Sequence, residues 1–409
     1  MAAVLPFPAF FLLLPMVGGM NRRMEQRLRI IQVVNVRWFN ATAWYGLSLS
    51  RLLREAGHEV LVAGLPGTEA FAKAEAMGLG PVPLNLNSVN PLVLAGELRR
   101  LRSLLREFRP HIVNCHRGEG MLFWGMFKAL GHKYALVRTR GDQRPPKGNL
   151  PNRLLHARLA DALVVTNTRT ARQCRELLGV PDDRLHVIPG GVDTARFAPD
   201  RRAGRAARAG LGFAAQDIVI GLLGRFDAVK GQRELLEAFG RMLRAAGDDV
   251  SGRLRLMLMG FSTSLSEDRV REWIREYGLE GRVAITGRVE RPSDYINAMD
   301  VGVVASQGSE AIARAALEIM ACGVPLVGTD VGVMPDLLPQ EALVSPGDPQ
   351  ALAGLLERAV KDHSFRGALQ ESARERMLTL SERSFLEQSM RVYAGALRDR
   401  SGPFPPARS

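Results

Sequence analysis

The chain has 409 residues, a length that predicts two domains, or three. Hydrophobic residues make up 46% and charged residues 24%, values that exclude a disordered chain and a collagen-like repeat. The three cysteines are far apart and form no C-x-x-C pair, which disfavours a disulfide framework and a zinc knuckle and fits a reducing cytoplasm. The net charge is +13, and it is uneven: residues 1–200 hold 27 Lys and Arg against 15 Asp and Glu, whereas residues 201–409 hold 28 against 27.

The basic first half predicts an anionic partner, with compositional drift as the alternative explanation. Nucleic acid is the partner that the sequence supports least, because no basic run is interleaved with aromatic residues that would stack on bases. The densest basic stretch, residues 98–109, places Leu and Phe at helical spacing beside four arginines. It is either an ordinary amphipathic surface helix or a helix that rests on anionic lipid headgroups. The second interpretation predicts peripheral contact with the inner face of the cell membrane.

The N-terminal residues 2–19 are apolar, but they contain three prolines and lack a preceding positive charge. A signal peptide needs that charge, and a spanning helix disfavours the prolines. We expect residues 1–24 to be either a misannotated start, with translation beginning at Met20 or Met24, or a short membrane-associating leader. The first interpretation is favoured.

Hydrophobic runs and helical patterns alternate along the rest of the chain, and this alternation predicts an α/β protein with parallel sheets. We expect one Rossmann-like domain over residues 25–198 and a second over residues 199–380, with residues 194–216 as the connection. A C-terminal helix and tail over residues 381–409 are expected to return to the first domain. Ligands of such sheets bind at the carboxyl ends of the strands, so two facing domains predict a cleft between them. Strands are predicted at 28–36, 59–63, 111–114, 135–138, 162–165, 185–188, 218–223, 254–259, 283–286, 301–305 and 325–328.

Residues 309–328 carry two glutamates, Glu310 and Glu318, at a predicted strand-to-helix junction. A helix N-terminus offers free N–H groups and the positive end of a dipole, which suits phosphate. Glu310 at the helix start can face a reacting sugar, and Glu318 can accept hydrogen bonds from ribose hydroxyls. The alternative is that both are solvated helix glutamates.

A second motif, Gly224-Arg-Phe-Asp-Ala-Val-Lys-Gly231, follows a hydrophobic strand. Arg225 offers a bidentate fork and Lys230 a point charge, and together they are suited to neutralising a diphosphate leaving group. The alternative is a surface turn with incidental cations.

These two motifs resemble those of the retaining glycosyltransferases of family 4, which share the GT-B fold, and the resemblance spans most of the chain. Residues 190–197 look like the Asn-Gly-Val-Asp signature of that family, with Gly190 in place of Asn. Residues 286–289 are similar to its Thr-Gly-x-Val segment, which implies that Val289 lies at the donor site. Residues 110–116 resemble its Pro-Asp-Val-Val-His-x-His strand, which implies that His116 contacts the donor sugar.

The chain departs from the family at two places that line the implied pocket. Asn40 and Ala41 stand where a Gly-Gly pair of the first loop would approach phosphate or acceptor, and residues 311–314 read Ala-Ile-Ala-Arg where Gly-Phe-Gly is usual. These differences leave the identity of the donor open but not the class of reaction.

The resemblance implies transfer of a glycosyl unit from a nucleoside diphosphate sugar to a hydroxyl acceptor, with retention. We expect Arg225, Lys230 and the backbone amides near Ala313 and Arg314 to stabilise the leaving group, while Glu310 orients the sugar. No Asp-x-Asp occurs in the sequence, so neither a metal nor another cofactor is expected. The acceptor is expected to be anionic or lipid-linked, such as a lipopolysaccharide core.

Two other classes stay open. One is a nucleotide-sugar epimerase, or a phosphorylase with pyridoxal phosphate on a lysine, built on the same two-domain scaffold. The other is a binding protein with a decayed site, which the presence of all four charged residues of the two motifs disfavours. The absence of G-x-G-x-x-G after the first strand makes a nicotinamide oxidoreductase the weakest candidate.

Overall fold

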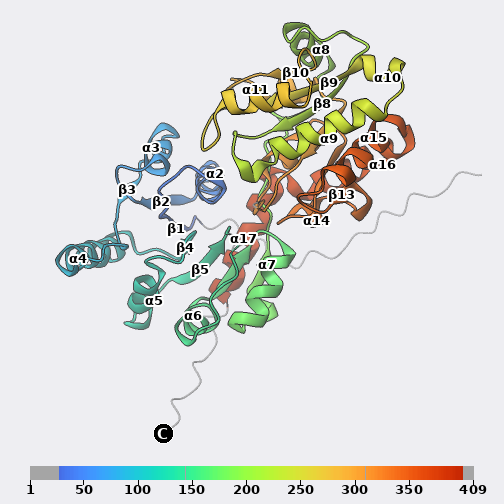
Figure 1. Cartoon of the computed structure of the whole chain (residues 1–409). Coiled ribbons are helices and arrows are strands. Elements are labelled where there is room, and N and C mark those ends of the chain that lie inside the picture. The colour runs from blue at the N-terminus through green and yellow to red at the C-terminus, as the bar shows by residue number, and fades with distance from the viewer. Residues whose placement is uncertain (1–26, 143, 309, 399–409) are drawn as a thin grey trace, which may run out of the picture.

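The computed structural model describes residues 27–398, apart from residues 143 and 309. The expected leader, residues 1–24, lies outside the described residues, as do residues 399–409 of the expected tail. The described chain forms two domains, each built on a parallel sheet (Figure 1). Two Rossmann-like domains were the fold predicted from the sequence, and this prediction is confirmed.

The first domain contains a seven-stranded sheet in the order β3-β2-β1-β4-β5-β6-β7, with every neighbouring pair parallel. Its central strands are continuous apolar runs because both faces of a parallel sheet are covered. Ile30 and Ile31, for example, are both fully buried although they point to opposite faces. The strands are β1 (Arg29–Val34), β2 (Glu59–Gly64), β3 (Val82–Pro83), β4 (Ile112–Cys115), β5 (Ala135–Arg140), β6 (Ala162–Val165) and β7 (Leu185–Val187).

Helices connect these strands, and asparagine or threonine side chains cap several of their N-termini by accepting a backbone N–H bond, as Asn40, Thr68 and Asn90 do. The helices are α2 (Ala41–Glu55), α3 (Glu69–Ala76), α4 (Pro91–Phe108), α5 (Met121–Ala129), α6 (Leu150–Leu154) and α7 (Thr168–Gln173). Short π-helical or 3-10 turns follow at η1 (Leu155–Leu159), η2 (Cys174–Leu178) and η3 (Asp182–Arg184).

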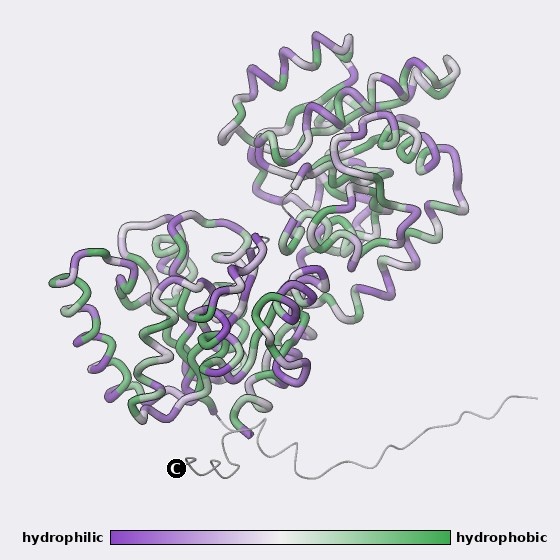
Figure 2. The backbone as a smooth tube through the Cα atoms, turned by 60° about the horizontal axis from the view of Figure 1, so that its bottom comes forward, coloured by the Kyte–Doolittle hydropathy of each residue, from purple (hydrophilic) through white to green (hydrophobic). Residues whose placement is uncertain are grey.

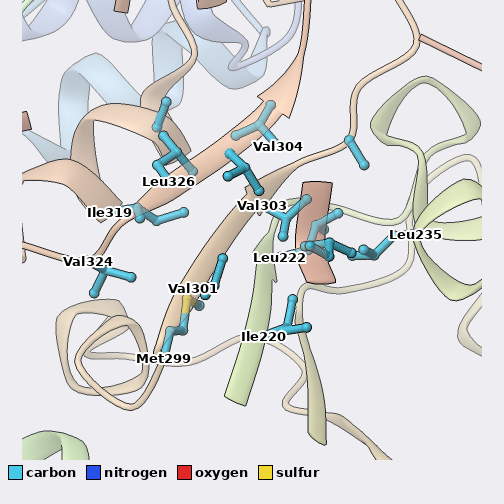
Figure 3. Close-up of a cluster of buried hydrophobic side chains, with 14 of the residues drawn as sticks. Ile220, Leu222, Leu235, Met299, Val301, Val303, Val304, Ile319, Val324 and Leu326 are labelled. Carbon is cyan, nitrogen blue, oxygen red and sulfur yellow. The ribbon is translucent and has the colours of Figure 1, made fainter. Parts of the chain in front are cut away.

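The second domain contains a six-stranded parallel sheet in the order β10-β9-β8-β11-β12-β13. Its core packs residues of β8, β11 and β12 against helices, as the close-up of Ile220, Leu222 and Val303 shows (Figure 3). The strands are β8 (Ile218–Leu223), β9 (Leu254–Met259), β10 (Val283–Ile285), β11 (Val301–Val304), β12 (Leu326–Thr329) and β13 (Leu343–Val344).

The helices of the second domain begin earlier than the sequence predicts. Residues 194–216 were expected to connect the two domains, and within them Arg201–Gly210 form a helix, α8, that was not predicted; Ala and Arg favour helices, and the Asp200 carboxylate caps its first turn. The others are α9 (Gln232–Ala245), α10 (Asp248–Arg253), α11 (Glu267–Glu276), α12 (Pro292–Ile296), α13 (Arg314–Ala321), α14 (Met334–Leu337), α15 (Pro349–Lys361), α16 (His363–Leu380) and α17 (Glu382–Arg398), with 3-10 turns η4 (Ala228–Lys230) and η5 (Gln340–Ala342).

The helix α17 belongs in space to the first domain, against α2 and β5 (Figure 1). Phe385 is fully buried there, and the Tyr393 hydroxyl accepts hydrogen bonds from the side-chain amides of Gln32, at 2.9 Å, and Asn114, at 3.0 Å. Figure 2 shows the two lobes of the molecule, with hydrophobic segments concentrated inside each lobe. The C-terminal helix therefore completes the core of the N-terminal domain.

The two domains also touch through loops. Ile312, from the second domain, is fully buried in the hydrophobic cluster that holds Tyr45 and Phe385. Asp336 on α14 accepts hydrogen bonds from the backbone N–H of Thr168, at 2.7 Å, and from its hydroxyl, at 2.5 Å. The first contact holds the loop before α13 against the first domain, and the second holds α14 against it.

Candidate active site

A cleft of about 1290 Å³ lies between the two domains, at the carboxyl edges of both sheets. Eight of the ten residues predicted for the site line its walls. The eight comprise two from the first domain and six from the second: Asn40, Ala41, Arg225, Lys230, Glu310, Ala313, Arg314 and Glu318. The two residues outside the wall are His116 and Val289.

Lys230 and Glu310 form an ion pair on the second-domain wall. Glu310 is only 7% exposed, and it also accepts a hydrogen bond of 2.5 Å from the Ser306 hydroxyl, at the end of β11. Lys230 ends the turn η4 that follows β8. This pairing was not predicted from the sequence, where the cation and the acid were expected to have separate tasks.

The close approach of the two segments depends on Gly231. Its φ is +73°, and a Cβ atom there would collide with the carbonyl oxygen of Ala305. A glycine at this position therefore lets the Lys230 turn pack directly on the backbone that leads to Glu310.

Arg225 lies beside this pair, half exposed, with its guanidinium bonded to the Asp227 carboxylate at 2.9 Å. Gln232 holds the backbone of Arg225 through a 2.8 Å bond to its carbonyl. Arg225 and Lys230 thus reach the cleft from one loop between β8 and α9, as the spacing of the motif predicts.

Glu318 lies one turn inside α13, 9% exposed, and accepts a hydrogen bond of 3.1 Å from Arg314. Burial raises the pKa of Glu318, and the Arg314 guanidinium opposes that shift. The Arg314 guanidinium carbon lies 4.8 Å from the ring centroid of Trp44, on α2 of the other domain. This stack brings α13 and the first domain together at the cleft.

The helix α13 begins three residues later than the sequence analysis expected, at Arg314 rather than next to Glu310. Ala313 has φ +49° and ψ +54°, a left-handed conformation. The helix α13 therefore cannot extend on its N-terminal side beyond Arg314. No side chain caps the first turn of α13, and Ala313, Arg314 and Ala315 line the cleft, so the leading N–H groups of this helix lie at the cleft wall without a side-chain acceptor. Backbone N–H groups of this kind bind anions.

Asn40 and Ala41 form the N-terminus of α2 on the opposite wall. The Asn40 side chain accepts a 3.1 Å bond from the N–H of Ala43 and so caps the helix. Where the resembled family has a flexible glycine, Asn40 therefore caps helix α2 and fixes the loop before it.

His116 lies beneath the cleft wall rather than on it, with 1% of its surface exposed. Its Nε2 lies 2.7 Å from the side-chain oxygen of Gln32, which assigns the proton to Nε2, and its Nδ1 has no partner. Burial, aided by the nearby Arg138, lowers the pKa of His116 to about 3. Gly46 of helix α2 packs against the ring, and neither Gly46 nor His116 lines the cleft.

Val289 is partly buried against the core of the second domain and does not line the cleft. Its neighbour Arg288 stacks on Phe261, with 4.0 Å between the guanidinium carbon and the ring centroid, and Phe261 does line the cleft. The 286–289 segment thus approaches the site through Arg288 and Phe261.

The first-domain wall also carries a set of charged residues that was not predicted from the sequence. The segment Arg138-Thr-Arg-Gly-Asp142 ends strand β5 and opens onto the cleft. Charged residues at the carboxyl end of a buried parallel strand are the signal that would have revealed them. Arg117, Glu119, Arg144, Lys147 and His156 line the same wall.

Within residues 27–398, apart from the two that are not described, no group of three or more His, Cys, Asp or Glu side chains is arranged to hold a metal ion. The same described residues include no helix that is long and apolar enough to span a bilayer.

Two family models match the chain, and together they cover most of it. Residues 42–196 match the family described as Glycosyltransferase Family 4, and residues 217–362 match the one described as Glycosyl transferases group 1. A D-inositol 3-phosphate glycosyltransferase of Nocardiopsis dassonvillei is 30% identical over 279 residues, which are 66% of this chain and 63% of that protein. The chain therefore matches less than two thirds of the length of this relative.

Solved structures with the same architecture include a glycosyltransferase from Rickettsia africae, with a TM-score of 0.80 and 17% identity over 91% of this chain and 100% of that one. Another is Alr3699/HepE of Anabaena in complex with UDP, with a TM-score of 0.77 and 18% identity over 90% of this chain and 100% of that one. At these identities the likeness concerns the fold. The chain thus has the two-domain fold of these solved structures, and it matches the Glycosyltransferase Family 4 model in its first half and the Glycosyl transferases group 1 model in its second.

Proposed function

We propose that the protein transfers a glycosyl unit from a nucleoside diphosphate sugar to a hydroxyl group of an anionic acceptor, with retention at the anomeric carbon. The observation that carries this proposal is the convergence of Lys230, Glu310 and the uncapped start of α13 on one wall of the cleft. These groups supply a cation, a carboxylate and backbone donors, the set that a diphosphate and its sugar require.

In this proposal Lys230, Arg225 and the N–H groups of Arg314 and Ala315 stabilise the charge that develops on the departing diphosphate. Glu310 hydrogen-bonds the transferred sugar, and Glu318 accepts bonds from the ribose. No metal is needed for the leaving group, because cations and amides of the chain carry that charge. The UDP complex of Alr3699/HepE, a protein of the same fold, supports a nucleotide as the donor.

The roles of His116 and Val289 at the donor site stay predictions, because neither residue lines the cleft. His116 supports the wall from behind, through Gln32 and Gly46, so any contact with the donor sugar requires α2 to move. Val289 packs against the core of the second domain, next to Arg288, which stacks on the cleft residue Phe261.

The acceptor is proposed to be anionic because the first-domain wall is rich in arginine. The D-inositol 3-phosphate glycosyltransferase of Nocardiopsis is named for a phosphorylated acceptor, which agrees with this choice. A lipid-linked or lipopolysaccharide acceptor satisfies the same chemistry, and we propose peripheral contact with the inner face of the membrane for that case. The protein should then bind anionic vesicles at low salt and leave them at 0.5 M salt, which shortens the Debye length to less than about 8 Å.

A thermal-shift panel of UDP, GDP and ADP sugars tests the donor, because a ligand that binds the folded state raises the melting temperature. Turnover of the hit is then measured with and without acceptor, and the anomeric configuration of the product is read by NMR. Release of the nucleotide only when an acceptor is present supports the transferase. Conversion of the sugar nucleotide without acceptor would identify an epimerase, and absence of any shift across the panel contradicts the donor assignment.

A further inference from the structure

Arg138 and Arg140 are both buried on the first-domain wall of the cleft, and they share one carboxylate. Arg138 is 1% exposed and Arg140 is 8% exposed, although both line the cleft. Asp142 lies 2.7 Å from Arg140 but 3.8 Å from Arg138. Among the described residues, Asp142 is the carboxylate that lies within ion-pair distance of Arg138.

The hydrogen bonds of these two arginines are incomplete. Arg138 donates to the carbonyl of Cys115 at 2.9 Å and to that of Thr139, while its Nε has no partner. Arg140 donates from its terminal nitrogen to the carbonyl of Arg144, and its Nε likewise has no partner. Burial lowers the pKa of Arg138 to about 10, so the side chain still carries its charge at neutral pH. A buried charge without a full set of partners is costly, and a ligand that supplies them binds strongly.

The surrounding wall has a marked excess of positive charge. Arg117 is bonded to Glu119, at 3.0 Å from Nε, so this pair largely neutralises itself. Exposed Arg144 and Lys147 line the same wall. The wall therefore has five cationic side chains and two carboxylates, Glu119 and Asp142. An excess of this size favours a group with two negative charges over a single carboxylate.

We infer that Arg138 and Arg140 form a subsite that binds a phosphate group of the acceptor, with Arg144 and Lys147 at its open side. The inference rests on the proposed function, since the phosphate would hold the acceptor across the cleft from Lys230 and Glu310. Planar guanidinium groups bind phosphate oxygens with two parallel bonds, and two of them on neighbouring positions of one strand end make a fixed receptor. Asp142 competes with the phosphate for the same guanidinium groups.

Titration with inorganic phosphate tests the subsite. The nucleotide identified in the panel is kept at saturation, so that phosphate cannot occupy the donor side, and the melting temperature is followed. We expect phosphate to raise the melting temperature of the wild type and to bind Arg140→Gln at least tenfold more weakly. Asp142→Asn should bind phosphate more tightly, because it removes the competing carboxylate. Arg158→Gln is the matched control, since Arg158 is exposed in the same domain and does not line the cleft.

The Asp142→Asn variant keeps the test decisive even if a substitution of a buried arginine prevents folding, because a gain in affinity cannot arise from misfolding. Equal phosphate binding by wild type, Arg140→Gln and Asp142→Asn would overturn the subsite. Nucleotide binding measured in the same samples separates the two proposals: if the nucleotide binds and phosphate does not, the subsite alone fails.

Two further arms identify the source of the phosphate. Glycerol 3-phosphate represents a soluble monoester, and vesicles of phosphatidylglycerol represent a lipid phosphodiester. Dependence on Arg140 with the monoester supports a water-soluble acceptor, whereas dependence on Arg140 with the vesicles alone supports a lipid-linked one. Absence of an Arg140 effect in both arms counts against the subsite.

Discussion

Lys230 and Glu310 stand 80 residues apart in the sequence and form an ion pair at the cleft wall. Each is the charge partner of the other in this structure. A diphosphate that binds Lys230 must therefore compete with Glu310, and the exchange would free the carboxylate to bond the sugar.

Replacement of Lys230 by alanine should lower kcat/KM at least tenfold, or about 1.4 kcal/mol of transition-state stabilisation. The variant removes a cation from the leaving group and leaves a buried Glu310 carboxylate without its partner. Steady-state kinetics with the identified donor measures the effect. Lys361→Ala is the control, because Lys361 pairs only with Glu357 on the surface of α15. An unchanged kcat/KM would reject the role of Lys230 in neutralising the diphosphate.

Replacement of Gly231 by alanine should be far more damaging than its left-handed backbone alone explains. At Gly57, which has φ +87° and nothing within 4 Å of an added Cβ, alanine costs only the backbone strain, about 1–2 kcal/mol. At Gly231 the same methyl group also meets the carbonyl of Ala305, so the cost should exceed that of Gly57→Ala by more than about 1 kcal/mol. Urea unfolding of the two variants compares them directly. Equal losses of stability in the two variants would contradict this prediction and show that the Lys230 turn shifts away from the Ala305 carbonyl at little cost.

Replacement of Ala313 by glycine should stabilise the protein. Removing the strain of a left-handed alanine should stabilise the folded state by about 1–2 kcal/mol. Losing one buried methyl group should destabilise it by up to about 0.8 kcal/mol, so the net change is stabilising. Ala206→Gly is the matched control, because Ala206 is exposed in the regular helix α8 and glycine there should cost about 1 kcal/mol. Differential scanning calorimetry resolves the opposite signs. A destabilised Ala313→Gly would mean that the first domain, through Ile312, holds the loop in place at no cost in strain.

The free energy of unfolding should fall as the pH drops below about 6.5. The pKa of His116 is about 3 in the folded state because of burial and of Arg138, so below about 6.5 the unfolded chain takes up a proton that the folded chain refuses. His156, whose pKa burial and Arg138 lower to about 4, acts in the same direction. Each contributes a slope of up to about 1.4 kcal/mol per pH unit.

Urea unfolding between pH 7 and pH 4.5 measures this slope. His116→Gln should flatten it relative to the wild type, whereas His363→Gln, at an exposed position, should leave it unchanged. Parallel curves for wild type and His116→Gln would contradict the lowered pKa of the buried His116 ring.

The sequence predicts the elements of the fold where strands are continuous apolar runs, as at Ile218–Leu223, since the burial of both faces leaves a signal in the residues themselves. It also places Arg225, Lys230 and Glu310 near one another, because parallel strands deliver their carboxyl ends to one edge. The helix α8 escaped detection because alanine, glycine and arginine also suit a linker.

What the sequence could not predict depends on contacts between distant residues. The backbone conformation of Ala313 is set by the packing of Ile312 in the other domain, and an alanine gives no sign of a left-handed φ. The place of His116 follows from Gly46, which lets helix α2 pack onto the ring. The strand predicted at 135–138 included Arg138 but not Arg140, and only the tertiary structure reveals that the two arginines share one aspartate.

The helix α17 has a consequence for how the protein is made. The N-terminal domain buries Phe385 and Tyr393 in its own core, so the ribosome must translate the whole second domain before the first can acquire its final packing. Until then the surface of α2 and β5 that α17 covers stays open in the nascent polypeptide. The domain that is translated first is therefore completed only after the second has been translated.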